Sequence, residues 1–570
     1  MKPFVLHAAC LTGAMLLATQ ASAQVALPPA QVDPGRVQQQ LTPPEAPRTA
    51  PEIVTPEIPA TVAPADAATT RITVREIRVE GSSVYPAGAF ADLTAPLTGR
   101  EVSLAEAFTL ADAITARYRG DDYILSRAIV PAQRIENGVL RIQIVEGFVS
   151  GVEFQGKASA VLRRYADALT AEKPLRGKVL ERYLLLMNDI AGTSARAVLA
   201  PAPDVRGGSF VTIVADQKTV DAYAGFDNHG SRYIGPVQYY AGVSTNNALG
   251  LGERIALNYA GAVPTSELQY VSGQIDLPLG RDGLLLSANA GYSHSRPGFV
   301  LEPLGARATG TSLGARVSYP LIRSRAATLR LSLGFHYLDS RTVINDLPDF
   351  SPSSYDRIRA LRLTSSYDFA DRAGGQNLIA LEYSQGLSIF GSLSEARLNP
   401  SRPNAKNGFH KLTAEISRRQ TLDSMVRGLA VYGVVKAQTS LGDSLFSSEQ
   451  FGLGGAIIGT AYDPSEIIGD SGIAGRIELQ YATALPAVKG AAQFYGFYDV
   501  GTTRNQVVQP GEARSASLSS AGGGMRFTLT RHLSGYVEAA QPLTRDVQAQ
   551  LLAKKDARPT RLFVGVTMRY

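Results

Sequence analysis

The sequence predicts a signal peptide, two small α+β domains and a C-terminal antiparallel transmembrane β-barrel of about 16 strands. Three observations predict this architecture. Residues 1–23 have the pattern of an export signal, residues 73–217 show a mixed helix and strand pattern that occurs twice, and residues 218–570 alternate between apolar and polar residues over segments of roughly ten residues.

The composition of the 570-residue chain suits a large β-protein. It contains 54 Gly, which serve turns, and 24 Tyr and 19 Phe, which can lie at membrane interfaces. Beyond the predicted signal, no apolar run reaches the roughly 18 residues that a membrane-spanning helix needs, which argues against a helical membrane protein. The net charge of +6 is mild, and no stripe of Lys and Arg interleaved with aromatic residues suggests nucleic-acid binding.

The N-terminal segment, residues 1–23, predicts export across the inner membrane. A charged start is followed by an apolar stretch from Phe4 to Ala18 and by the A-x-A cleavage pattern Ala21-Ser22-Ala23. The single cysteine, Cys10, lies within this segment. The mature protein should therefore contain no disulfide and no reactive thiol.

Residues 24–72 are rich in Pro and Ala and contain too few large apolar residues to form a core. They predict an extended periplasmic linker. A short helix over residues 36–41 is compatible with this stretch but would need a partner surface to be stable.

The first α+β domain is expected over residues 73–147. Alternation from Val74 to Val79 predicts a strand, and Ser103 with Glu106 forms a capping box for a helix that extends to about Arg119. Two further strands are expected at 123–130 and 139–145, joined by turn residues.

The second α+β domain, residues 148–217, repeats this order. The expected elements are a strand at 152–154, helices at 160–169 and 178–188, and strands at 196–199 and 210–214. Such repetition predicts tandem modules.

The alternating pattern of residues 218–570 predicts the barrel. Every second residue from Leu329 to Tyr337 is apolar, and the segment from Arg561 to Tyr570 alternates in the same way. Among β-structures, only a closed sheet leaves no unpaired backbone groups in hydrocarbon. The expected lumen is polar and is lined by residues such as Arg330, His336, Arg476 and Glu478.

Several passages resemble the outer-membrane transporters of two-partner secretion, the haemolysin secretion/activation family. Residues 118–147 are similar to the family's first POTRA domain, although Asp122 stands where a glycine is commoner. Residues 180–192 are similar to the helix and turn of its second POTRA domain. Residues 451–501 resemble a long loop folded back into the barrel, near 451–470, together with the strands that it touches.

The resemblance also implies site residues within the barrel. The family's loop tip carries an arginine before a glycine and an aromatic residue, and it is held by acidic residues of the barrel wall. This chain has the tip residues Thr460, Ala461, Tyr462 and Asp463 and the wall partners Glu478, Asp499 and Gly501. Because Thr460 replaces the arginine, we expect no bidentate charge-assisted anchor and weaker locking of the loop.

The resemblance implies that the protein exports an unfolded, haemolysin- or adhesin-like partner whose N-terminal two-partner secretion domain docks on the periplasmic POTRA domains. It implies a monomer in the lipid of the Gram-negative outer membrane. Gly565, Met568 and Tyr570 are similar to the C-terminal signal that the barrel-assembly machinery reads, although Phe563 stands where a polar residue is commoner. Transport should not use ATP, because the sequence has no G-x-x-x-x-G-K-[ST] motif.

Three other functions deserve comparison with export. The string Gly469-Asp470-Ser471-Gly472 matches the surroundings of a chymotrypsin-like nucleophile, but no histidine stands in a matching context. No catalytic residue, cofactor or metal site is therefore expected. A porin or autotransporter would not need the periplasmic modules, whereas an assembly factor for outer-membrane proteins would be expected to have a longer series of them.

Overall fold

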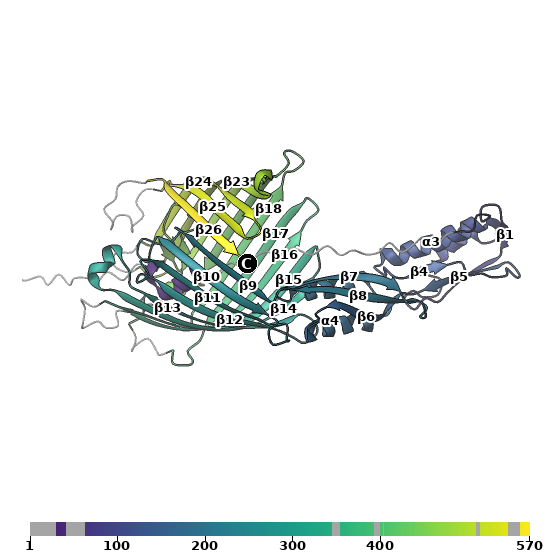
Figure 1. The fold of residues 1–570 in the computed structure, drawn as a ribbon, viewed down its shortest axis with the longest axis horizontal. Helices are drawn as coiled ribbons and strands as arrows, with labels where there is room; N and C mark the ends of the chain where they lie inside the picture. The colour runs from purple at the N-terminus through teal and green to yellow at the C-terminus, as the bar shows by residue number, and fades with distance from the viewer. Residues whose placement is uncertain are drawn as a thin grey trace, which may run out of the picture.

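The computed structural model describes residues 30–41, 63–344, 354–392, 399–402, 404–508, 513–544 and 559–570. Two small domains follow one another along the long axis of the molecule and lead to a large barrel (Figure 1). The expected signal peptide lies outside the described residues. Among the described helices, none combines the length and the apolar character that crossing a membrane requires.

The first domain contains two small sheets. Its elements are β1 (Arg71–Val74), β2 (Glu76–Glu80), α2 (Ala91–Thr94), η2 (Ala95–Leu97), β3 (Arg100–Ser103), α3 (Leu104–Gly120), β4 (Arg127–Ile129) and β5 (Val139–Val145). The expected strand from Val74 to Val79 is divided, because β1 pairs with β3 whereas β2 pairs with β5. The predicted capping box starts α3: Ser103 accepts a hydrogen bond from the Glu106 amide, and the Glu106 carboxylate accepts one from the Ser103 amide.

The second domain consists of a three-stranded sheet covered on one face by two helices. Its elements are β6 (Phe148–Gly156), α4 (Ala160–Ala171), α5 (Gly177–Asp189), β7 (Thr193–Pro201) and β8 (Gly208–Gln217). The strand order is β6-β8-β7, so β7 forms one edge of the sheet. Leu169, Leu184, Val211 and Ile213 belong to the core between helices and sheet.

Asp122 joins the two domains. Its backbone has a positive φ of 74°, a conformation that favours glycine. Its carboxylate accepts a hydrogen bond from the Lys178 amide (2.8 Å), and its carbonyl oxygen accepts one from the Gly177 amide (2.8 Å). Helix α5 begins at Gly177, and the side chain at its own N-cap, Arg176, accepts no capping hydrogen bond. The first domain therefore supplies the N-terminal cap of a helix in the second.

We expect Asp122→Gly to loosen this joint while changing overall stability little. Loss of the cap should cost about 1 kcal/mol, and relief of the positive φ should offset up to about the same amount. Spin labels on the exposed Thr109 and Arg164 should give a broader distance distribution in the variant. Asp122→Asn, which keeps an acceptor oxygen, is the control, and an unchanged distribution in Asp122→Gly would contradict the role of the cap.

The barrel is a closed antiparallel sheet of sixteen strands within the described residues, which confirms the predicted fold class. The strands are β9 (Val220–Asp227), β10 (Val237–Asn246), β11 (Arg254–Val263), β12 (Gln269–Leu279), β13 (Leu284–Ser295), β14 (Arg307–Arg323), β15 (Ala327–Val343), β16 (Ser354–Ala370), β17 (Gly375–Gly386), β18 (His410–Thr421), β19 (Leu429–Thr439), β22 (Ser471–Leu485), β23 (Gly490–Arg504), β24 (Ser515–Thr530), β25 (Leu533–Pro542) and β26 (Arg561–Arg569).

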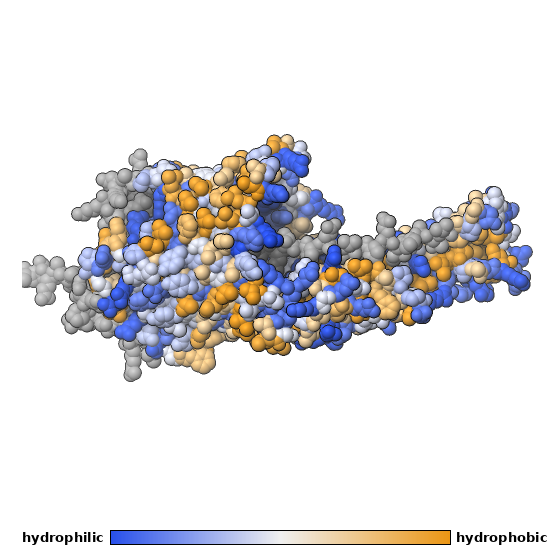
Figure 2. Space-filling model, in the orientation of Figure 1, coloured by the Kyte–Doolittle hydropathy of each residue, from blue (hydrophilic) through white to orange (hydrophobic). Residues whose placement is uncertain are grey.

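The two faces of the barrel differ as the alternation predicts. Leu331, Leu333, Ile477 and Leu479 are exposed on the outside, and Figure 2 shows apolar residues over much of the outer wall. The ladder between β26 and β9, from Arg569 and Tyr223 to Gly565 and Asp227, closes the barrel. It is the shortest ladder between neighbouring strands in the described part of the barrel, and we call it the seam.

A helix lies inside the barrel, toward the end away from the two small domains (Figure 1). It comprises η1 (Ala30–Val32) and α1 (Pro34–Leu41), and we call it the lumen helix. Asp33 caps it by accepting hydrogen bonds from the amides of Gly35 (2.9 Å) and Arg36 (3.3 Å).

Within the expected periplasmic linker over residues 24–72, residues 30–41 lie inside the barrel instead, whereas residues 24–29 and 42–62 lie outside the described residues. Val32 and Val37 are buried against residues of the barrel and its loops, among them Tyr233 and Leu268, and Gln38 donates hydrogen bonds to the barrel strands β13 and β14. The short helix considered for residues 36–41 is present, begins at Pro34, and has the barrel interior as its partner surface.

Candidate functional site

The candidate site is a loop folded into the lumen between β19 and β22, residues 440–470, which we call the inward loop. It contains η5 (Ser447–Glu449) and two short strands, β20 (Phe451–Leu453) and β21 (Ile467–Gly469), which pair with each other. The turn between β20 and β21, residues 454–466, is its tip. Gly454 has a φ of 111°, and a Cβ there would lie 2.1 Å from the Asp463 carbonyl oxygen, so the tight turn requires glycine.

Apolar contacts hold the tip against the barrel wall. Ile458, Ala461 and Tyr462 are buried in one cluster with residues of the surrounding strands, including Leu518 and Phe563. The Tyr462 hydroxyl also donates a hydrogen bond to the carbonyl oxygen of Ser519 (3.1 Å) and accepts one from the amide of Thr544 (3.2 Å). The tip is therefore packed on its apolar side and tied by hydrogen bonds to β24 and to the segment after β25.

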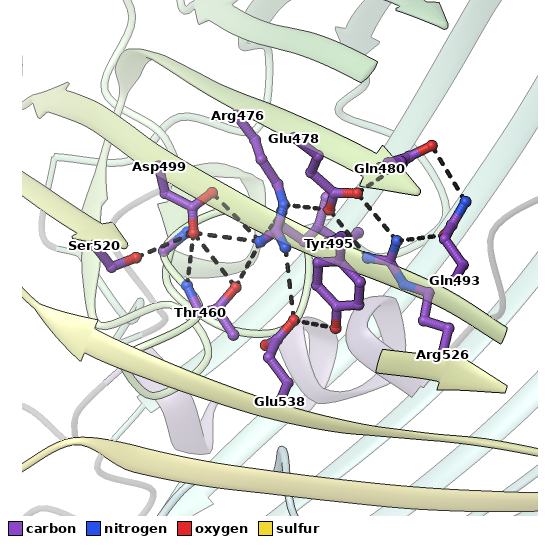
Figure 3. Close-up of polar contacts among 12 residues, drawn as sticks. Thr460, Arg476, Glu478, Gln480, Gln493, Tyr495, Asp499, Ser520, Arg526 and Glu538 are labelled. Carbon is purple, nitrogen blue, oxygen red and sulfur yellow. Dashed lines mark hydrogen bonds and ion pairs between the residues drawn. The ribbon is translucent and has the colours of Figure 1, made fainter. Parts of the chain in front are cut away.

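Asp499, on β23, receives the backbone of the tip. Its carboxylate accepts hydrogen bonds from the amides of Gly459 (3.0 Å) and Thr460 (3.1 Å) and from the Ser520 hydroxyl (3.0 Å). Figure 3 shows Thr460, Ser520 and Asp499 pointing toward one another. Thr460 and Asp499 are both fully buried, so these hydrogen bonds do not compete with water.

Arg476, on β22, supplies the guanidinium that the tip lacks. Its Nη1 donates to the Thr460 hydroxyl (2.7 Å) and lies 3.3 Å from an Asp499 oxygen, and its Nε donates to Glu478 (2.7 Å). The side chain is 3% exposed, and its guanidinium carbon lies 3.8 Å from the centre of the Phe497 ring. The absence of a bidentate anchor at position 460 stays a prediction, but the barrel wall provides an arginine that donates a single charge-assisted hydrogen bond to the tip.

A second arginine extends this network along the wall. Arg526 forms a bidentate pair with Glu478, both distances being 3.0 Å, and Tyr495 donates to Glu538 (2.6 Å). Glu538 also lies 3.6 Å from Arg476. We call these residues, drawn in Figure 3, the wall cluster: Arg476, Glu478, Asp499, Arg526 and Glu538.

Asp463 anchors the other end of the tip. Its buried carboxylate pairs with Arg232 (2.5 Å), which follows β9, and with Arg561 (2.8 Å), the first residue of β26. Because β9 and β26 are neighbours, Asp463 connects the two sides of the seam. In this anchor the acid is on the loop and the two guanidiniums are on the barrel.

The lumen helix rests on the inward loop. Arg36 donates to the Gln450 carbonyl oxygen (2.8 Å) and to the Ser465 hydroxyl (3.3 Å). Gln31 donates to Glu466 (3.3 Å), a carboxyl group whose pKa is raised to about 7 by burial and by the nearby Asp463. The helix and the loop therefore occupy the lumen together.

The base of the inward loop is fixed by Glu449, whose side chain is fully buried. Its carboxylate pairs with Arg362 on β16 (2.7 Å) and Lys411 on β18 (2.5 Å). Burial opposes ionisation, but these two cations hold the pKa of Glu449 well below its usual range.

The remaining candidate residues of the barrel wall, and the Gly-Asp-Ser-Gly string at residues 469–472, contribute to the site in different ways. Gly501 allows close approach of the loop, because a Cβ there would lie 2.6 Å from Leu453. Among the contacts of the described residues, Glu478 is linked to the tip through Arg476. Ser471 accepts a hydrogen bond from the Ser440 amide (3.2 Å), and Asp470 accepts one from the Leu445 amide (2.9 Å), so the Gly-Asp-Ser-Gly string contributes to holding the loop.

The C-terminal residues lie on the outer wall or at its edge. Met568 and Tyr570 are 64% and 73% exposed, and Gly565 lies on β26. Phe563 points inward, where its ring stacks on that of His229 with centres 4.1 Å apart. Recognition of this segment by the assembly machinery stays a prediction.

Comparisons with known proteins agree with this architecture. The model of the family described as haemolysin secretion/activation protein ShlB/FhaC/HecB matches residues 207–527, and that of the ShlB-type POTRA domain matches residues 72–147. The heme/hemopexin transporter protein HuxB of Haemophilus influenzae is 25% identical over 79% of this chain and 79% of its own. The outer membrane transporter CdiB of Dickeya dadantii is 24% identical over 83% of each. The structure of CdiB from Escherichia coli shares the fold, with a TM-score of 0.70, 22% identity, and coverage of 92% of this chain and 94% of that one.

Proposed function

Because this chain belongs to the haemolysin secretion/activation protein family, we propose that it recognises one unfolded partner protein through its POTRA domains and exports it through the barrel without ATP. The family is one of outer-membrane transporters, and the protein lies in the outer membrane with its POTRA domains in the periplasm. The observation that carries the proposal is a closed, polar-lined barrel joined directly to a domain whose edge strand β7 has no further strand beside it among the described residues. The Asn188 side chain pairs with the Ala195 backbone on this edge, so the stretch beyond Ala195 is the part available for strand addition.

Strand β7 is the edge best suited to an extended client. It pairs with β8 along its whole length without a register shift, and its outward residue Val198 is 50% exposed. The opposite edge, β6, has a bulge between Val149 and Gly151, and bulges hinder strand addition. A client that adds a strand to β7 would be held by backbone hydrogen bonds with little dependence on its side chains.

Export requires the lumen to be vacated. The lumen helix and the inward loop both lie in the lumen, and they contact each other mainly through hydrogen bonds, such as those of Arg36. Hydrogen bonds of this kind contribute about 1 kcal/mol each, so a docked client can displace them one after another. Folding of the client outside the cell would then make its transport through the barrel directional.

The names of the relatives differ in what they say of the transported substance. HuxB is named for heme and hemopexin transport, and CdiB is named only as an outer membrane transporter. We propose for this chain a secreted partner with an N-terminal two-partner secretion domain, a cleaved signal peptide at residues 1–23, and a monomeric barrel inserted by the assembly machinery.

The proposal is tested by deleting the gene in the native host and assaying the culture medium and cell surface for a large exported protein. We expect one such protein to disappear and to return when the wild-type gene is restored. Unchanged secretion with depleted outer-membrane proteins would instead support an assembly factor.

Once the client is known, its docking edge can be mapped with single cysteines. A cysteine in place of Val198 on β7 should cross-link to a cysteine in the client's N-terminal domain, whereas one in place of the exposed Gln155 on β6 should not. Equal cross-linking at both positions would contradict docking on β7.

A further inference from the structure

Three arginines of neighbouring strands lie on the outer face of the barrel. The exposed leucines that define this face are Leu313 on β14, Leu333 on β15 and Leu363 on β16. Arg307, Arg341 and Arg357 each lie an even number of residues from the leucine on their own strand. Because side chains alternate along a strand, the arginines point outward with the leucines. We call these three residues the arginine row.

The strand register places the arginine row on a diagonal. Arg341 lies opposite Thr309 on one side and opposite Tyr355 on the other. Arg307 is two residues from Thr309, and Arg357 is two residues from Tyr355, so both are diagonal neighbours of Arg341. Residues in such positions are about 7–8 Å apart, within reach of long side chains. The three guanidiniums can therefore meet one ligand.

Two members of the arginine row have no partner in the described part of the chain. Arg307 and Arg341 are exposed, and neither forms a hydrogen bond or an ion pair with a described residue. Arg357 donates to the carbonyl oxygen of Gly391 (3.0 Å), and its guanidinium carbon lies 4.6 Å from the centre of the Tyr355 ring. The row is thus held in place at one end and is free at the other.

The surroundings of the arginine row do not neutralise its charge. Asp339 is the one acidic residue on the outer face of β14, β15 and β16 in the described ranges. It faces Arg357 across the ladder but forms its ion pair with a fourth arginine, Arg359 (2.9 Å), and it also accepts a hydrogen bond from the Tyr337 hydroxyl (3.0 Å). Like charges on neighbouring positions of a sheet repel, so an anion from outside the chain would stabilise the row.

The arginine row lies at the extracellular edge of the membrane. Arg323, at the opposite end of β14 from Arg307, contacts the periplasmic second domain. On β16, the outward residues Tyr355 and Tyr367 are separated by about 40 Å of strand, which at the usual tilt of 35–45° gives about 30 Å of height. Aromatic residues flank an apolar band of about 25 Å in such barrels. Tyr355 therefore marks the outer interface, and the arginines beside it lie level with the lipid head groups.

We propose that the arginine row binds the phosphate groups of lipid A, the doubly phosphorylated glycolipid of the outer leaflet. Guanidiniums bind phosphate oxygens in bidentate fashion, and basic clusters at this depth bind lipid head groups. The acyl chains would cover the exposed leucines below the row. A glycerophospholipid with a single phosphate would engage fewer of the arginines. The inference rests on the position of the protein in the outer membrane and is independent of the proposed export.

The test measures lipid binding to the purified full-length protein in detergent by native mass spectrometry. The probes are diphosphoryl lipid A, lipid A from which both phosphates have been removed, and phosphatidylglycerol. We expect the wild type to bind diphosphoryl lipid A most tightly. Arg307→Gln combined with Arg341→Gln should weaken that binding tenfold or more, the change that corresponds to about 1.4 kcal/mol.

Arg504→Gln is the matched control. Arg504 is exposed on the outer face at the extracellular end of β23, and its diagonal neighbours Ile473 and Ser517 carry no charge. This variant should bind diphosphoryl lipid A as the wild type does. Heat-modifiable electrophoresis shows whether each variant is folded. If the double variant does not fold, Arg341→Gln alone takes its place, with an expected weakening of about threefold or more, which is about 0.7 kcal/mol.

Four results would overturn the inference. The first is a wild-type protein that does not bind diphosphoryl lipid A, and the second is equal binding by the wild type and the folded arginine variant. Equal binding of the dephosphorylated lipid would mean that this face binds acyl chains alone. Equal binding of phosphatidylglycerol would assign the face to ordinary phospholipids. Because no client takes part in this measurement, each of these results leaves the test of the proposed function unchanged.

Discussion

Glu449→Gln is expected to lower the free energy of unfolding of the barrel by about 3–5 kcal/mol. The substitution keeps the size of the side chain but removes the carboxylate that pairs with Lys411, whose side chain is 9% exposed, whereas Arg362 keeps Glu382 at 3.2 Å. Breaking a buried pair by removing one partner is strongly destabilising because the remaining charge is left uncompensated. The midpoint of heat-modifiable electrophoresis, compared with that of the wild type, measures the effect.

Glu415→Gln provides the control for that experiment. Glu415 pairs with Lys436 at 2.9 Å, but both side chains are about a third exposed, so the loss should remain below about 1 kcal/mol. Equal shifts in the two variants would contradict the role given to burial. Because the pKa of Glu449 is depressed in the folded protein, its stabilisation is fully present above the unfolded value of about 4.3 and is lost only as the pH falls toward the folded pKa.

Arg323→Glu is expected to detach the second POTRA domain from the barrel. Arg323 on β14 forms a bidentate pair with Asp189 at the end of α5, with distances of 2.8 and 2.9 Å and side-chain exposures of 5% and 15%. Reversal of the charge places two carboxylates in contact in a largely dry interface, which costs several kcal/mol. Spin labels on the exposed Arg164 and Asp423 should change from one narrow distance distribution to a broad one, and export should fall strongly.

A reciprocal charge reversal tests whether the effect of Arg323→Glu comes from charge repulsion or from general disruption of the interface. Asp189→Arg combined with Arg323→Glu restores an opposite pair and should recover most of the narrow distribution. Arg176→Glu, at a pair whose side chains are 38% and 29% exposed, should change little. A narrow distribution in Arg323→Glu alone would mean that other contacts position the domain, such as the hydrogen bond from Tyr183 to Asp282.

The sequence predicted the elements whose signals are local. The capping box at Ser103 marks the start of α3 because both partners lie within one helical turn. The alternation of apolar residues predicts the barrel because each strand faces lipid on one side and the lumen on the other. The break between β1 and β2 was missed because it depends on pairing with two different strands, which no local pattern encodes.

The candidate site was predicted only in part, because several of its contacts also depend on how the chain folds and leave no local pattern in the sequence. Arg476 was predicted from the sequence to face the lumen beside Glu478, two residues later, but its contact with the tip was not predicted. Arg232 and Arg561 carry no such signal, because the fold brings them to Asp463 from opposite ends of the barrel sequence. The lumen helix was predicted as part of the linker because its few apolar residues can stabilise a helix only when the barrel surrounds them.

The bridge at Asp463 has a mechanical consequence. A closed barrel resists widening only as strongly as its weakest strand pair, and the seam has the shortest ladder between neighbouring strands in the described part of the barrel. Asp463 fastens Arg232 on one side of that joint to Arg561 on the other. Withdrawal of the inward loop would therefore clear the lumen and remove the ion pairs across the seam in the same step. The barrel would then be easiest to widen when a bulky segment of the client passes through it.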